Sequence, residues 1–292
     1  MLVIICEQAM NERFITTADG ARLATEALGE PVQGTILLVM GATASRLWWP
    51  EGLKAELVRT GYRVISFDHR DTGESTTHAP GDVRYDIFDI ATDLIAILDG
   101  YGVSAAHLVG MSLGGYVSQI AALDHPDRAL SLTLISSEPL ATPYAGEGIA
   151  PDFMAHFTTM ETLDWSDRAA VTAFLLRVGE LSAGSTPFDR DQVLRRIERD
   201  LDRSSSMQSG FNHSMLSGDL APRHRADRLA LPVLIVHGSA DPVISVQAAE
   251  AAARTISGAR LMVIEGRGHE LVDRDTPQIA QAIVMLAEGA HG

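Results

Sequence analysis

The sequence predicts an α/β fold, namely a mostly parallel, doubly wound sheet with a helical cap insertion. Three observations support this prediction. Short apolar runs alternate with stretches of helical spacing in residues 1–141 and again in residues 223–292, as expected of successive βαβ units that form one core domain. One apolar run leads through a glycine-rich turn, with a serine at its apex, into a helix. Residues 142–222 hold helical stretches without a buried-strand pattern, which predicts a helical cap.

The alternation can be followed along the whole chain. The first two strands are predicted on either side of a type I′ turn at Asp19-Gly20. Apolar runs place the later strands at 35–40, 63–67, 106–109, 130–135, 231–237 and 260–264. Helical spacing places core helices at 50–60, 86–98, after residue 112, at 246–256 and at 276–287, and cap helices near 151–159, 167–178, 189–201 and 207–216.

Composition excludes several classes of function. The 292 residues include 46% hydrophobic ones, which is enough for a sizeable core. The formal net charge of −15 argues against a nucleic-acid or anionic-membrane partner. Cys6 is the sole cysteine, so an intrachain disulfide is impossible. No apolar run approaches the roughly 20 residues of a membrane span, and no basic segment precedes the apolar Leu2–Ile5 as in a secretory signal. We therefore expect a cytoplasmic location.

A Gly-x-Ser-x-Gly motif marks the candidate nucleophile. The apolar run ends in Gly110-Met111-Ser112-Leu113-Gly114, and helical spacing begins directly afterwards. Such a strand–turn–helix bends so sharply that the residues two before and two after the serine crowd each other, and only glycine lacks the side chain that would clash. The bend would lift Ser112 off the sheet edge and direct the first N–H groups of the helix toward a reacting atom.

The candidate base and acid follow from chain order and position. A serine hydroxyl needs a base, and the base needs a partner that orients it. In this architecture the order is serine, acid, histidine, and sites lie at the carboxyl ends of strands. Asp241 and His269 each follow a predicted strand downstream of Ser112, so we predict a triad of these three; Glu138 is the alternative acid. The remaining candidate histidines are interpreted as structural or solvated: His69, His107, His213, His224 and His237.

Two further features complete the predicted site. The backbone N–H groups of Leu113 and Ala42, the latter in the loop after the 35–40 strand, are the expected oxyanion donors. No metal or organic cofactor is implied. Apolar residues that could line a substrate pocket are Trp48, Trp49, Phe153, Phe157, Met207 and Phe211. For any single cap residue, packing within the cap's own small core is the favoured interpretation.

At the level of motifs, the chain resembles the α/β-hydrolase superfamily over nearly its full length. The motifs are the serine elbow, Gly238-Ser239-Ala240-Asp241-Pro242 and Gly266-Arg267-Gly268-His269. Within that superfamily, the aclacinomycin methylesterase group of anthracycline pathways is similar at 39–41, 49–50, 68–77 and 98–102. The resemblance implies carboxylic ester hydrolysis, with a methyl ester of a bulky, polyketide-like acid as substrate. The chain has Met40-Gly41 where His-Gly is usual in the superfamily. The polar loop 68–73 is interpreted as a structural network of ion pairs and turns.

Other chemistries on the same residues stay open. The preferred reaction is attack by Ser112 on a small-molecule ester, with an acyl-enzyme intermediate that water then hydrolyses. A lactonase, a perhydrolase or an enzyme of cyanohydrin C–C cleavage could use the same triad. Halide and epoxide chemistry on this fold resembles members with aspartate at the elbow apex, so Ser112 argues against both. A non-catalytic ligand-binding protein is the alternative from a different class.

Overall fold

The computed structural model describes residues 11–290. Within these residues one sheet of eight strands has the order β1-β2-β4-β3-β5-β6-β7-β8. The first two strands pair antiparallel with their neighbours, and all pairs from β4 to β8 are parallel. The bounds are β1 Asn11–Thr16, β2 Arg22–Leu28, β3 Gly34–Val39, β4 Tyr62–Phe67, β5 Ala106–Met111, β6 Ala129–Ile135, β7 Val233–Gly238 and β8 Arg260–Ile264. The predicted mostly parallel sheet is therefore confirmed.

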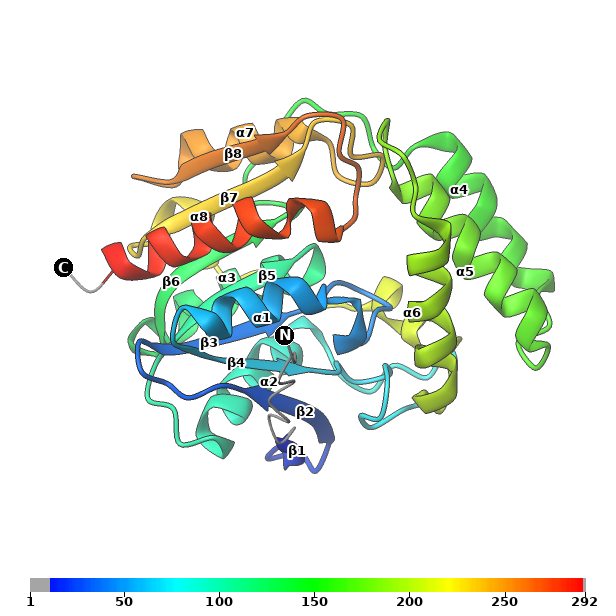
Figure 1. The fold of residues 1–292 in the computed structure, drawn as a ribbon, viewed down its shortest axis with the longest axis horizontal. Helices are drawn as coiled ribbons and strands as arrows, with labels where there is room; N and C mark the ends of the chain where they lie inside the picture. Colours follow the sequence, from blue (N-terminus) through cyan, green and yellow to red (C-terminus); the bar gives the residue numbers. More distant parts are fainter. Residues whose placement is uncertain (1–10, 291–292) are drawn as a thin grey trace, which may run out of the picture.

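Helices cover both faces of the sheet, as a doubly wound fold requires. In Figure 1, α1 and α8 lie in front of the sheet, and α2 and α3 lie behind it. Apolar side chains of α2, α3 and α7 pack in one core cluster, and those of α1 and α8 pack in a second. The bounds are α1 Glu51–Arg59, α2 Ile87–Gly100, α3 Leu113–Asp124, α7 Val246–Thr255 and α8 Thr276–Gly289.

The central strands are apolar runs because they are buried on both faces. Every residue of β5 and of β7 is buried, whereas β8, at the edge of the sheet, is partly exposed. The N-terminal hairpin forms as predicted, but its turn is longer than a two-residue type I′ turn. A five-residue loop, closed by the Thr17 N–H donating to the Ala21 carbonyl at 2.8 Å, connects β1 to β2.

Residues 142–222, which we call the cap, lie between β6 and β7 in the chain. They hold α4 Pro151–Thr158, α5 Arg168–Ser182 and α6 Arg190–Arg203. The parallel strands point toward these three helices in Figure 1, so the cap lies beyond the carboxyl ends of the strands. The fourth predicted helix is a 3₁₀ segment, η4 Ser209–Met215, rather than an α-helix.

The cap is hydrogen-bonded to the core in two places, after β3 and after β8. On one side, the Trp48 indole N–H donates to Asp200 of α6 at 2.9 Å. On the other side, the His269 backbone N–H donates to the Ser182 carbonyl at the end of α5, at 2.8 Å. The Ser185 N–H donates to the Gly266 carbonyl at 3.0 Å next to it. The loop that carries His269 is thus paired, backbone to backbone, with the cap.

Candidate active site

The turn after β5 has the geometry of a nucleophile elbow. Ser112 has φ 52° and ψ −119°, outside the regions that side-chain-bearing residues normally adopt. A Cβ on Gly110 would lie 2.4 Å from the Gly114 carbonyl carbon, and one on Gly114 would lie 2.0 Å from the Val39 carbonyl oxygen. Both positions therefore require glycine, and the close packing fixes Ser112 at the N-cap of α3.

Unusual backbone angles gather at the carboxyl edge of the sheet. Besides Ser112, Thr43 after β3 has φ 66° and Ser136 after β6 has φ 45°. The Ser137 hydroxyl donates to the Ser112 carbonyl at 2.8 Å and holds the elbow from the β6 side. Strained backbone of this kind persists where the surroundings over-determine it, and it concentrates at functional sites.

Asp241 and His269 meet in the structure. The His269 Nδ1 lies 2.8 Å from Asp241 Oδ2. Asp241 Oδ1 accepts the N–H groups of Val243 at 2.8 Å and of Ile244 at 2.9 Å. Because a carboxylate oxygen accepts, His269 donates through Nδ1–H, which leaves its Nε2 lone pair free to act as a base.

The electrostatics keep Asp241 ionised. Its side chain is fully buried and that of His269 is 13% exposed. Burial alone would raise the pKa of Asp241, but the charge of His269 when it is protonated, together with its hydrogen bond, outweighs burial, so the pKa of Asp241 lies below its usual value. An ionised Asp241 can stabilise the imidazolium that forms when His269 takes up a proton.

His237 is a third side chain close to the pair of Asp241 and His269. Its Nε2 donates to the Ile244 carbonyl at 2.8 Å and lies 3.5 Å from Asp241 Oδ2. Burial lowers the pKa of His237, against the opposing charge of Asp241. It is a buried neutral histidine with a backbone partner, which agrees with its interpretation as structural.

The loop after β3 packs directly against the nucleophile candidate. A Cβ on Gly41 would lie 3.3 Å from Ser112 Cβ and 3.9 Å from its hydroxyl oxygen. The next residue, Ala42, is half-buried. Among the described residues, the backbone N–H groups of Ala42 and Leu113 have no hydrogen-bond acceptor. Two N–H groups without acceptors near one hydroxyl are what an oxyanion hole requires.

The polar loop after β4 forms a buried ion-pair network. Asp68 accepts the Arg46 backbone N–H and guanidinium, each at 2.8 Å, and Arg203 from α6 at 2.8 Å. Arg70 pairs with Asp93 at 2.7 Å and with Asp19 at 2.6 Å. Arg46 Nε and Arg203 Nη1 are the network's buried nitrogens without a hydrogen-bond partner among the described residues. The charges otherwise pair with one another, which agrees with the interpretation of the loop as structural.

The two tryptophans after the β3 loop have different environments. Trp48 is half-buried, donates to Asp200 and packs against Leu176, Val193 and Ile197 of the cap. Trp49 has 0% exposed surface and packs in the core cluster with α1 and α8. The prediction that Trp49 lines a pocket is therefore wrong, because its indole is fully buried among core side chains.

The aromatic residues of the cap pack mainly on each other. Phe153 and Phe157 have ring centroids 4.9 Å apart, and Phe157 lies 6.0 Å from Phe211. Trp165 and Phe174 complete the cluster with ring-centroid separations of 5.6 to 6.4 Å. Phe153 is buried, while Phe157, Phe211 and Met207 are half-buried. These contacts agree with the interpretation of the aromatic residues as a small cap core.

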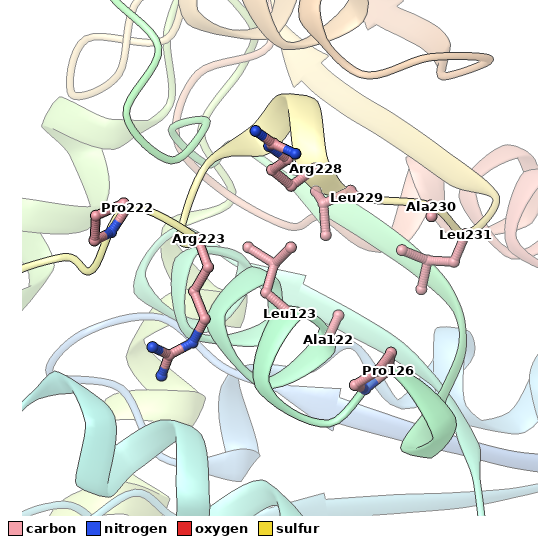
Figure 2. Close-up of a pocket in the computed structure, with 9 residues that line it drawn as sticks. All are labelled: Ala122, Leu123, Pro126, Pro222, Arg223, Arg228, Leu229, Ala230 and Leu231. Atoms are coloured by element: carbon pink, nitrogen blue, oxygen red, sulfur yellow. The ribbon is translucent and has the colours of Figure 1, made fainter.

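Two hollows of similar size open on the surface. One of about 550 Å³ contains two arginines among apolar side chains (Figure 2); its lining is Ala122, Leu123, Pro126, Pro222, Arg223, Arg228, Leu229, Ala230 and Leu231. It lies at the C-terminal end of α3, roughly 18 Å of helix away from Ser112 at the N-cap. The other, of about 570 Å³, borders Asp241 and the cap segment 145–151. The second hollow is therefore the one adjacent to the candidate site.

Two further buried histidines contact the loop after β3, and sequence reasoning missed this. His69 Nε2 donates to the Met40 carbonyl at 2.8 Å. His213 Nδ1 accepts the Thr43 N–H at 3.0 Å. The second contact joins residues 170 positions apart, so no local pattern could have indicated it.

Within residues 11–290, no cluster of three or more His, Cys, Asp or Glu side chains has the arrangement of a metal site. In the same range, none of the helices combines the length and apolar character needed to cross a membrane.

Comparison with known proteins places this geometry in a family. The model of the alpha/beta hydrolase fold matches residues 34–275. The chain is 31% identical to rhodomycin D methylesterase of Streptomyces peucetius, over 90% of this chain and 93% of that protein. It is 32% identical to the rhodomycin D methylesterase of Streptomyces sp. strain C5, with the same coverage. Its fold is similar to that of an esterase from Exiguobacterium antarcticum, with a TM-score of 0.76 at 23% identity over 94% of this chain and 98% of that one. The chain belongs to the α/β-hydrolase family.

Proposed function

We propose that this carboxylic ester hydrolase is a serine esterase that works through an acyl-enzyme. The observation that carries the proposal is the 2.8 Å hydrogen bond from His269 to a fully buried Asp241, at the same sheet edge as the elbow that presents Ser112. A base oriented by an ionised acid, at the same edge as a serine, is the arrangement that could activate the serine hydroxyl for acyl transfer.

The proposed reaction has two halves. His269 Nε2 takes the proton of the Ser112 hydroxyl while its oxygen attacks the ester carbonyl, and the N–H groups of Ala42 and Leu113 stabilise the oxyanion. His269 then gives the proton to the departing alcohol, which leaves Ser112 acylated. Water, deprotonated by His269, attacks the acyl group, and the acid leaves as Ser112 recovers its proton.

For the substrate, we propose a methyl ester of a bulky, polyketide-like acid. The support is the 31–32% identity to the two rhodomycin D methylesterases. Lactone hydrolysis and perhydrolysis would use the same three residues and differ in the leaving group or in the second half-reaction, whereas cyanohydrin cleavage would use them without an acyl-enzyme. Because Ser112 acts first in each, its replacement tests the mechanism, and a substrate panel tests the substrate class.

Turnover of p-nitrophenyl acetate by the wild type and by Ser112→Ala tests the mechanism. The wild type should hydrolyse the ester, and the alanine variant should lose about three or more orders of magnitude in kcat. Ser257→Ala, at an exposed serine between α7 and β8, is the matched control and should keep full activity. Hydrolysis that persists in Ser112→Ala would refute the serine mechanism. Methyl esters of acids from acetate to polycyclic aromatics then test the substrate, and preference for the smallest acid would contradict the bulky-acid proposal.

A further inference from the structure

We propose that His213 is a positioning residue for the oxyanion hole: it holds Thr43 in a left-handed conformation and so directs the Ala42 N–H toward the site. The inference rests on the proposed function, because it concerns the donor that the acyl-transfer reaction would use. It adds a residue from η4, at the end of the cap, to the machinery at the sheet edge.

The contacts of His213 fix its tautomer. Its Nε2 lies 2.8 Å from the Arg70 carbonyl oxygen, which can only accept, so Nε2 carries the proton. Its Nδ1 lies 3.0 Å from the Thr43 backbone nitrogen, whose N–H can only donate. His213 is therefore neutral and bonded at both ring nitrogens, and it joins the β3 loop to the β4 loop.

Thr43 needs such a support. Its φ of 66° lies in the left-handed region, which β-branched residues rarely adopt. The contact from η4 is not confined to the imidazole, because Gly210 packs on the same backbone. A Cβ at Gly210 would lie 3.2 Å from the Thr43 carbonyl oxygen and 3.3 Å from its Cα. The segment η4 thus covers Thr43 from two points.

A second histidine holds the other end of the same loop. His69 donates to the Met40 carbonyl at 2.8 Å, and its ring meets that of His213 edge-on at 5.8 Å. Gly41 and Ala42 lie between these two anchored residues. Since the peptide planes on either side are held at the Met40 carbonyl and at the Thr43 N–H, the Gly41–Ala42 peptide between them has less freedom to turn its N–H away from the site.

The surroundings keep His213 in the neutral form, whose Nδ1 accepts the Thr43 N–H. It is 6% exposed, and the groups that face it are the rings of His69 and Tyr85, the Arg70 carbonyl and the nearby carboxylate of Asp71. Burial lowers the pKa of His213, against the opposing effects of the Arg70 carbonyl and Asp71. A proton on Nδ1 would point at the Thr43 N–H and break the contact.

Two near-isosteric substitutions separate the two contacts. In His213→Asn, the amide oxygen takes the place of Nδ1, so the acceptor for Thr43 is retained and the bond to Arg70 is lost. In His213→Gln, the amide nitrogen takes the place of Nε2, so the bond to Arg70 is retained and the acceptor for Thr43 is lost. A merely structural anchor would suffer equally from both.

The readouts are kcat, KM and affinity for an aryl trifluoromethyl ketone, whose hemiketal with Ser112 would carry an oxyanion. We expect His213→Gln to lose about 10- to 100-fold in kcat, with KM within about threefold of the wild type and a matching loss in ketone affinity. We expect His213→Asn to stay within about fivefold of the wild-type kcat.

His224→Gln is the matched control. His224 is 1% exposed, its Nδ1 accepts the Ala221 N–H at 3.1 Å, and its Nε2 lies 2.9 Å from Asp124. It pairs with Asp124 at the C-terminal end of α3, roughly 18 Å of helix away from Ser112 at the N-cap. In this variant too, a backbone N–H loses its imidazole acceptor, here the N–H of Ala221. The variant should therefore be less stable but keep the wild-type kcat per folded molecule.

The outcomes are distinct. The inference is overturned if His213→Gln keeps the wild-type kcat and ketone affinity, or if the Asn and Gln variants lose kcat equally while circular dichroism shows both folded. Should His213→Gln not fold, the Asn variant decides: near-wild-type kcat supports the inference, and a loss beyond about tenfold overturns it. A wild type without Ser112-dependent hydrolysis would instead overturn the proposed function and this inference with it.

Discussion

Replacing Asp241 by asparagine exchanges a carboxylate oxygen for an NH₂ group and so tests the proposed acid of the triad. The structure determines how the new amide would lie. The oxygen at the Oδ1 position accepts two backbone N–H groups, from Val243 and Ile244, and an NH₂ there would oppose both. The amide oxygen must therefore stay at that position, and the NH₂ takes the place of Oδ2, 2.8 Å from His269 Nδ1.

The consequence is a change of tautomer. The NH₂ donates to His269 Nδ1, so the imidazole proton moves to Nε2, which can then no longer accept the Ser112 proton. The expected loss is about 10⁴-fold in kcat, the size found when an orienting aspartate becomes asparagine in a serine protease. That factor corresponds to about 5–6 kcal/mol of activation free energy. Because Oδ1 keeps both N–H partners, the unfolding midpoint should change little.

The assay is p-nitrophenyl acetate hydrolysis at fixed pH, with thermal unfolding in parallel. Asp124→Asn is the matched control, because Asp124 also pairs with a buried histidine, His224, at 2.9 Å. It should keep the wild-type kcat. An Asp241→Asn variant within about tenfold of the wild-type kcat, with unchanged unfolding, would refute the assignment of Asp241 as the orienting acid.

Two other predictions concern stability. In Gly114→Ala, the new Cβ would lie 2.0 Å from the Val39 carbonyl oxygen, so urea unfolding should show a loss of about 4 kcal/mol or more in the free energy of unfolding. Gly289→Ala is the control, because its Cβ meets nothing within 4 Å, and it should be neutral or stabilising. Equal losses in the two variants would contradict the packing argument. Burial is the main cause that lowers the pKa of His69 from 6.5 to about 3. The unfolded chain therefore binds a proton that the folded chain does not, and stability falls as pH drops below 6.5, by about 2 kcal/mol from this group at pH 5. Urea unfolding at pH 7.5 and pH 5 checks it, and a His69→Gln variant with an undiminished pH dependence would show the reasoning to be wrong.

The sequence predicted those parts of the molecule whose cause is local. The elbow was predictable because only glycine fits at positions 110 and 114, and the central strands because burial on both faces demands apolar runs such as β5. Asp241 and His269 were predictable as candidate acid and base because each follows a strand, and parallel strands end at one edge. Their mutual contact is a property of the fold that the chain order only implies.

What could not be predicted depends on long-range contacts. Trp48 and Trp49 are adjacent residues of the same type, yet Trp48 contacts Asp200 of the cap and Trp49 is fully buried in the core. Local spacing carries no information about which indole faces which partner. The contact of His213 with Thr43 likewise arises only when η4 has docked on the sheet edge.

The pairing of the cap with the histidine loop restricts how this enzyme can be re-engineered. A Cβ at Gly268 would lie 1.9 Å from the Ser182 carbonyl oxygen, and one at Gly184 would lie 2.7 Å from the Gly268 nitrogen. The two backbones fit only as a matched set. A chimera that imports a foreign cap to change substrate range must therefore either retain native residues 182–186 at the splice or import the corresponding His269 loop together with the cap.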